Sequence, residues 1–186
     1  MSIATGTIAD RFIPRTAVNN IVLVFAGALI TAVAAQIQVP MWPVPLTLQT
    51  FAVLLVGATL GAGRGAASLA TYLAMGAVGL PVFASAKTLT GVLPTAGFLV
   101  GFVFAAALVG FLASRGFTES VAKVAFSFAL GSAVIYVFGV SGLMLSLGLT
   151  FSQAIAAGVV PFLIGDAIKA VAAAALLPTA WKLVRK

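Results

Sequence analysis

The sequence predicts an all-α integral membrane protein, a compact bundle of six transmembrane helices with both termini cytoplasmic. Of its 186 residues, 62% are hydrophobic and only 7% are charged, which is too few charges to cover a soluble fold. Apolar runs long enough to cross a bilayer recur along the chain, and most lysines and arginines lie between them. We expect residues 1–186 to form a single six-helix membrane domain with a short polar lead over residues 1–20.

Polar or proline- and glycine-rich connections separate the expected spans. The first run follows the polar lead, which carries Arg11 and Arg15. This pattern could also be a cleavable signal sequence, but the later spans favour a first helix. Three prolines make the next connection rigid, because each one fixes its own φ angle. The predicted spans are residues 21–36, 46–62, 66–80, 95–113, 121–138 and 161–186.

The C-terminal part of the chain is harder to divide. Residues 140–150 are apolar but interrupted by glycines, so the fifth span is expected to end at residue 138. Residues 151–160 could form a short interfacial or buried helix. Pro161 suits the first turn of the last span, since a proline lacks only an N–H that would be unpaired there. Trp181 and the basic residues after it suit a membrane–water interface.

The positive charges indicate the orientation. Lys87 alone lies on one side of the predicted bundle, while Lys169 falls within a span. The positive-inside rule therefore places both termini in the cytoplasm of a multi-pass protein of the cell (inner) membrane. The proline-rich connection, the Lys87 loop and the Asp166 end of the last helix then share the outer side. The terminal side carries Arg11, Arg15, Arg64, Arg115, Lys123, Lys182, Arg185 and Lys186.

The composition excludes several classes of function. The chain has no cysteine and no histidine, and its acids are Asp10, Glu119 and Asp166. No metal site, no bound cofactor and no enzyme active site is expected from so few ligating and catalytic groups. The chain lacks a phosphate-binding P-loop, so it does not use ATP by that route. Its basic residues follow membrane topology, so we expect lipid and not nucleic acid around it.

Asp166 and Lys169 stand out within the last span. They are three residues apart, so they share one helix face, and each costs about 2.5–3.5 kcal/mol at the centre of a membrane helix. We interpret them as facing a cavity that holds a small polar or amphiphilic ligand. The alternative is a pair at the outer interface, in which Lys169 extends to water and Asp166 stabilises the helix N-terminus.

Four further residues are weaker candidates for ligand binding. Lys87 could contact a ligand or be a solvated loop residue. Gln49 and Tyr136 could line the site or join helices by hydrogen bonds. Trp42 could form a wall of the site or anchor the chain at the membrane interface.

Small residues recur at four-residue spacing, which allows helices to approach closely. The glycine series at Gly57 and at Gly97 favour packing within the bundle. Ala28 and Ala32 on the first helix could pack inside the bundle or contact another membrane protein.

Four stretches, in this order over nearly the whole chain, resemble the biotin-specific substrate-binding (S) components of energy-coupling-factor (ECF) vitamin transporters, the BioY family. The last stretch is the most distinctive, and it contains Asp166 and Lys169. The stretches are PVPLTLQ at residues 43–49, GAVGLPVF at 76–83, PTAGF at 94–98 and PFLIGDAIK at 161–169.

The resemblance implies a subunit that captures biotin from outside and carries it inward. It implies that Asp166 and Lys169 contact the ureido ring, and that the loops after the first and third helices close over the ligand. Partner ATPases, which alone use ATP, would act through a transmembrane coupling protein that contacts Ala28 and Ala32. Lys87 stands where some members have a ligand-contacting asparagine, and we hypothesise that it faces the valerate carboxylate. The alternatives are a self-sufficient carrier or channel for a small organic solute, or an S-component for another vitamin.

Overall fold

A computed structural model describes residues 6–89 and 93–184, and the chain within these ranges is largely helical. Arg185 and Lys186, which count toward the predicted cytoplasmic charge, lie outside them. A two-stranded antiparallel hairpin, β1 (Gln38–Val39) and β2 (Leu46–Thr47), follows the first long helix. Single 3-10 turns, η1 (Ala84–Ala86) and η2 (Val160–Phe162), interrupt two connections. The helices are α1 (Ile8–Phe12), α2 (Ala17–Gln36), α3 (Gln49–Leu60), α4 (Ala62–Ala77), α5 (Ala96–Ser114), α6 (Val121–Leu147), α7 (Phe151–Gly158) and α8 (Leu163–Val184).

Several helices are long and apolar enough to cross a membrane. Within the described ranges these are four stretches, Ala17–Gln36, Ala96–Ser114, Val121–Leu147 and Phe151–Leu183. The prediction of a helical, multi-pass membrane protein is confirmed at this level. Helix α3 has 12 residues, so it is about 18 Å long against about 30 Å for a bilayer core. A count of six full spans therefore stays a prediction.

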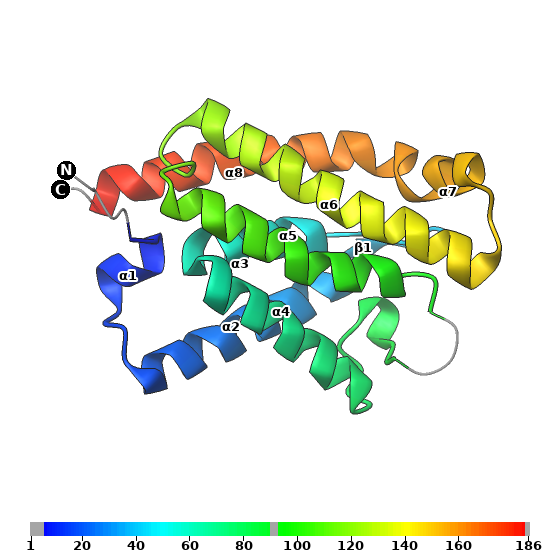
Figure 1. The fold of residues 1–186 in the computed structure, drawn as a ribbon, viewed down its shortest axis with the longest axis horizontal. Helices are drawn as coiled ribbons and strands as arrows, with labels where there is room; N and C mark the ends of the chain where they lie inside the picture. The colour runs from blue at the N-terminus through cyan, green and yellow to red at the C-terminus, as the bar shows by residue number, and fades with distance from the viewer. Residues whose placement is uncertain (1–5, 90–92, 185–186) are drawn as a thin grey trace.

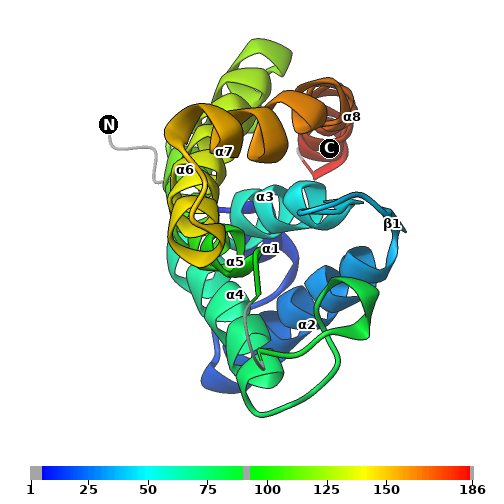
Figure 2. The same cartoon turned by 90° about the vertical axis from the view of Figure 1, so that its right-hand side faces the viewer.

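Helix α5 is the centre of the bundle. It packs against α3, α4 and α6, while α2 flanks α3 and α4, and α8 lies across α6 and α3 (Figures 1 and 2). Glycines permit these close approaches: a Cβ on Gly57 would lie 2.5 Å from the carbonyl oxygen of Ala106, and one on Gly97 would lie 2.3 Å from that of Phe138. The predicted packing of both glycine series within the bundle is confirmed.

Two predicted boundaries in the C-terminal part are wrong. Helix α6 does not end at residue 138 but continues to Leu147. Gly142 in this stretch is a contact point and not a break, since a Cβ on it would lie 2.7 Å from the Cα of Gly97, whereas Gly148, with a φ angle of 66°, caps the helix end. The last helix begins at Leu163, after the turn that contains Pro161. The short helix expected before it is α7, which begins at a capping box made by Thr150 and Gln153.

A charged cluster ties α1 to the rest of the bundle. Asp10 accepts hydrogen bonds from Arg15 and from Arg64, each with a closest distance of 2.7 Å. The Arg15 guanidinium, followed by bonds from Thr7 and Arg64, holds the pKa of the Asp10 carboxyl well below its usual range, although burial opposes this. The C-terminal end of α8 reaches the same end of the molecule (Figure 1). Trp181 is buried there, 2% exposed, so the expected interface position for it is wrong.

Candidate ligand-binding site

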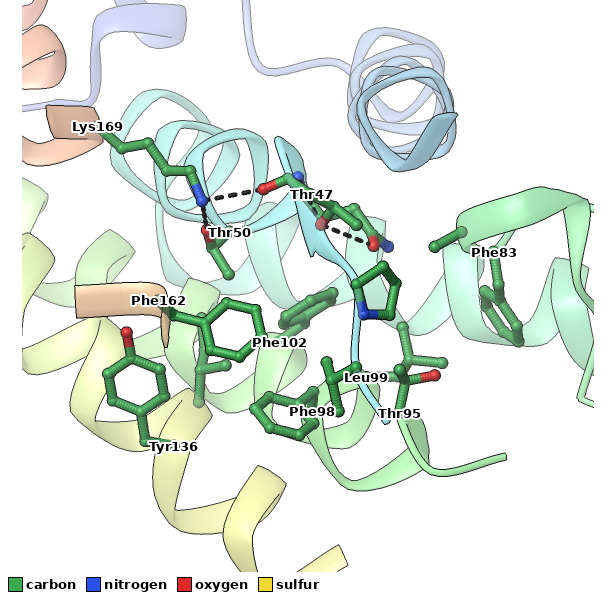
Figure 3. A pocket seen from close by; sticks show the side chains of 15 residues that line it. Thr47, Thr50, Phe83, Thr95, Phe98, Leu99, Phe102, Tyr136, Phe162 and Lys169 are labelled. Atoms are coloured by element: carbon green, nitrogen blue, oxygen red, sulfur yellow. Dashed lines mark hydrogen bonds between the residues drawn. The ribbon is translucent and has the colours of Figure 1, made fainter. Parts of the chain in front are cut away.

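A partly enclosed cavity lies between the N-terminal parts of α3, α5 and α8, in the half of the bundle remote from α1 (Figure 1; its lining is drawn in Figure 3). Its volume, counted as the space open to the centre of a water molecule, is about 40 Å³, enough for about three waters. Helices α3, α5, α6 and α8 contribute to its wall, together with the connections that carry β2 and η1. The lining residues are Val44, Pro45, Thr47, Gln49, Thr50, Phe83, Ala84, Thr95, Phe98, Leu99, Phe102, Ile135, Tyr136, Phe162 and Lys169.

The wall has an aromatic part and a polar part. The rings of Phe98 and Phe162 lie 6.4 Å apart at a tilted angle, with Phe102 beside them. Lys169 reaches toward Thr47 and Thr50 on the opposite side from Phe83 (Figure 3). Such a mainly apolar wall with a few convergent polar groups is typical of small-molecule sites.

Lys169 has an acceptor for every hydrogen of its ammonium group. Its Nζ atom donates to the Thr47 carbonyl oxygen at 2.9 Å, to the Thr50 hydroxyl at 2.7 Å and to Asp166 Oδ1 at 2.9 Å. Its side chain is only 14% exposed. A cation in such a setting needs these partners, because an unpaired buried charge is costly.

Asp166 is equally well satisfied. Its Oδ1 atom accepts from Thr50 at 3.0 Å as well as from Lys169, and its Oδ2 atom accepts from the Tyr136 hydroxyl at 2.5 Å. The side chain is 10% exposed and stands behind Lys169 and Tyr136, so it does not itself line the cavity. A ligand that bonded to this pair would replace existing hydrogen bonds and not fill vacant ones.

Local structure explains how these groups meet. Asp166 lies in the first turn of α8, where the helix dipole favours an anion, and Lys169 follows one turn later on the same face. Thr50 lies in the first turn of α3, and Thr47 ends the hairpin just before that helix. The N-terminal ends of α3 and α8 therefore bring a hydroxyl, a carbonyl, a carboxylate and an ammonium to one point.

A second polar chain leads away from the cavity. Gln49 is buried, 4% exposed, and its Nε2 atom donates to the Tyr72 hydroxyl at 2.7 Å. Tyr72 in turn donates to the Val82 carbonyl oxygen at 3.0 Å, in the connection between α4 and α5. Thr47 begins this chain, because its hydroxyl donates to Gln49 Oε1 at 3.1 Å.

The whole described bundle matches one protein family. The family model described as the BioY family matches residues 7–186. The chain belongs to the BioY family. A biotin transporter BioY from Thermotoga maritima is 43% identical over 144 residues, covering 76% of this chain and 83% of the relative. A biotin transporter BioY from Rhizobium etli is 41% identical over 143 residues, covering 72% of this chain and 76% of that one.

A solved structure supports the BioY fold independently. It is a crystal structure of the S-component for biotin from an ECF-type ABC transporter. The two chains superpose with a TM-score of 0.79 at 21% sequence identity, covering 92% of this chain and 95% of that one. At this identity the likeness shows the fold alone.

The structure brings four of the predicted ligand-binding residues of this BioY chain together and leaves two apart. Lys169, Gln49 and Tyr136 line the cavity, and Asp166 bonds to three of the lining residues, Lys169, Tyr136 and Thr50. Gln49 and Tyr136 also join elements by hydrogen bonds, so both interpretations of them fit. Trp42 is 83% exposed and lies outside the lining, as an interface anchor would.

Lys87 is also exposed and does not line the cavity, although Phe83 and Ala84 of the same loop do. The binding roles of all these residues stay predictions.

The small residues on α2 face inward. Ala28 is fully buried within the chain, so a partner could touch it only if α2 separated from its neighbours. The packing alternative therefore fits Ala28. Ala32 is partly exposed while packed against the core, and its contact with a partner stays a prediction.

Sequence reasoning missed several residues of the site. Thr47 and Thr50 gave one signal, a polar beginning to an otherwise apolar run, but nothing in the sequence linked them to Lys169. The aromatic residues Phe98, Phe102 and Phe162 gave none, because phenylalanine is common throughout this chain.

Proposed function

We propose that this protein is the biotin-binding S-component of an ECF-type transporter. It captures biotin from outside the cell and carries it inward, with energy supplied by partner ATPases through a transmembrane coupling protein. The observation that carries the proposal is the Asp166–Lys169 pair at the edge of an aromatic cavity, in a chain that belongs to the BioY family. Relatives at 43% and 41% identity are biotin transporters.

The chemistry of biotin suits the two parts of the wall. Its cyclic urea has a carbonyl oxygen that can accept from Lys169 and N–H groups that can donate to Asp166. Its thioether ring and aliphatic chain suit the aromatic part. The urea is both a donor and an acceptor. Its carbonyl oxygen can replace the acceptors that Lys169 has on Thr47 and Thr50, and its N–H groups can donate to Asp166, so neither the ammonium nor the carboxylate is left unpaired.

The cavity must enlarge to accept this ligand. Its present volume of about 40 Å³ compares with roughly 300–1,000 Å³ for small-molecule sites in general. The hairpin connection and the loop with Phe83 form one side of the wall, so their outward movement would open it. Closure of the same segments over biotin would exclude water from the bonds to Asp166 and Lys169, which strengthens them.

The proposal includes the membrane arrangement. One membrane domain carries six helices across or into the cell (inner) membrane, with both termini cytoplasmic. Arg11 lies in α1, and Arg15 and Arg64 both pair with Asp10 of that helix, whereas Lys87 is bridged to Phe83 in the cavity wall. This distribution supports an outward-facing cavity. The coupling protein would approach α2, with Ala32 as the expected contact.

Ligand binding and uptake test the proposal separately. The purified protein, analysed by native mass spectrometry and titration calorimetry in detergent, is expected to bind biotin but not thiamine or riboflavin. Binding of another vitamin in place of biotin would refute the ligand. Uptake of labelled biotin by cells is expected to require co-expressed ATPase and coupling subunits. ATP-independent uptake by this chain alone would instead identify a self-sufficient carrier.

A further inference from the structure

Part of the connection between α4 and α5 covers one side of the cavity. We define the covering loop as residues 82–89, of which Phe83 and Ala84 line the cavity. The loop closes on itself where the Phe83 amide donates to the Lys87 carbonyl oxygen at 3.0 Å. Two of its residues with a Cβ, Ser85 and Ala86, have φ angles of 60° and 54°. Such left-handed backbone is disfavoured for both residues, so other contacts must hold the loop in this shape.

The side-chain amides of two glutamines, one exposed and one half-buried, form the first set of contacts. Gln36 at the end of α2 donates from Nε2 to the Phe83 carbonyl oxygen at 3.2 Å and accepts at Oε1 from the Ala86 amide at 3.3 Å. Gln38 donates to the Ser85 hydroxyl at 2.8 Å. Water competes for such exposed bonds, so they hold the loop less firmly than a buried contact of equal length.

Tyr72 of α4 supplies the buried contact. It is fully buried, and its hydroxyl donates to the Val82 carbonyl oxygen at 3.0 Å while accepting from Gln49 at 2.7 Å. Its ring meets that of Phe83 edge to face, with centroids 5.3 Å apart. Gly76, one helical turn further on, leaves the space for that ring, since a Cβ there would lie 2.1 Å from Phe83 Cζ.

The Tyr72 hydroxyl also connects the covering loop to the charged pair, through Gln49 and Thr47. Lys169 donates to the Thr47 carbonyl oxygen, the Thr47 hydroxyl donates to Gln49, and Gln49 donates to Tyr72. Tyr72 does not line the cavity. Any effect it has on a bound molecule therefore passes through the loop or through Gln49.

We propose that Tyr72 is a positioning residue that fastens the covering loop to the cavity wall and thereby sets how slowly the ligand leaves. The inference rests on the proposed function for its ligand, biotin. The loop has to move for biotin to enter or leave, because the cavity in its present shape, about 40 Å³, is too small to hold biotin. A fastened loop opens less often, so the Tyr72 hydroxyl slows dissociation.

Tyr72→Phe tests this inference, because it keeps the ring against Phe83 and removes only the hydroxyl. A buried hydrogen bond is worth about 0.5–1.5 kcal/mol, so the biotin dissociation rate is expected to rise about two- to tenfold. Association is expected to change less than dissociation. The amide of Leu89, which donates to the Gly76 carbonyl oxygen at 3.0 Å, is expected to exchange with deuterium faster, both with and without biotin.

Ser68→Ala is the matched control. Ser68 is a fully buried residue one turn before Tyr72 on α4, and its hydroxyl donates to the Arg64 carbonyl oxygen within the helix. Its loss removes a buried hydroxyl from α4 without touching the loop. Dissociation and loop exchange are expected to match the wild type in this variant.

An unchanged dissociation rate in Tyr72→Phe, or an equal rise in Ser68→Ala, would overturn the inference. If the wild-type protein does not bind biotin, the proposed function fails. Hydrogen exchange of the Leu89 amide, measured without ligand, would still test whether Tyr72 holds the loop in place. An unchanged exchange rate at Leu89 in Tyr72→Phe would refute the proposed role of Tyr72.

Discussion

Replacing Asp166 by asparagine separates the charge of the site from its shape. The two side chains have nearly the same size, but asparagine has one acceptor oxygen and no negative charge. Asp166 accepts from Thr50 and Lys169 on one oxygen and from Tyr136 on the other. The Lys169 ammonium would keep the Thr47 carbonyl and the Thr50 hydroxyl as acceptors. The variant is therefore expected to fold, with a lowered melting temperature.

The expected loss of biotin affinity follows from the kind of hydrogen bond removed. A bond to a charged group is worth about 1.5–3 kcal/mol and a neutral one about 0.5–1.5 kcal/mol. Between the lower ends of these ranges, exchanging one for the other costs about 1 kcal/mol, and losing the charged bond outright costs about 3 kcal/mol at most. These limits correspond to a rise in Kd of about 5- to 150-fold.

Titration calorimetry in detergent measures this Kd, and size-exclusion chromatography with a thermal melt verifies folding. Asp10→Asn is the matched control, since it makes the same atomic change at the end of the molecule remote from the cavity. Its Kd is expected to lie within twofold of the wild type. If Asp166→Asn is folded and binds biotin within threefold of the wild-type Kd, the carboxylate does not contact the ligand and the proposed binding geometry is refuted.

Two further predictions concern stability. Gly97→Ala is expected to destabilise the protein by about 1–3 kcal/mol, because its Cβ would lie 2.3 Å from the Phe138 carbonyl oxygen. Gly63→Ala has open space within 4 Å and is expected to melt at or above the wild-type temperature; equal melting of the two variants would contradict the packing. Arg15 lowers the pKa of Asp10 in the folded protein. The ionised carboxylate therefore stabilises the folded state fully above the unfolded pKa of about 3.9, and this stabilisation is lost only as pH falls through the lower folded pKa. The melting difference between wild type and Asp10→Asn should therefore persist from about pH 8 to pH 5, and its loss within that window would refute the assignment.

The sequence pointed to the charged pair because ionisable groups are rare in it. With three acids in the whole chain, one beside a lysine in an apolar segment stands out on energetic grounds alone. The three-residue spacing then placed Asp166 and Lys169 on one face, since that relation depends only on helix geometry. Local rules of this kind do not depend on the neighbouring helices.

The rest of the site depends on how each helix is rotated about its axis. Helices that are apolar on every side carry no periodic signal that distinguishes a face toward the core from a face toward lipid. Ala28 could therefore be assigned to a partner or to the core with equal reason until the structure showed it buried. The same uncertainty applied to Gln49, Tyr136 and Trp42, of which the first two line the cavity and the third does not.

By itself, the sequence determined the membrane class, the family resemblance and the charged pair. Those follow from composition, from motifs and from spacing within one helix. Only the tertiary structure decided that Asp166 lies behind Lys169 and that Tyr72 connects the cavity wall to the covering loop. Contacts between residues more than 100 positions apart, such as Thr50 with Asp166, arise from the packing of whole helices, and no local pattern encodes them.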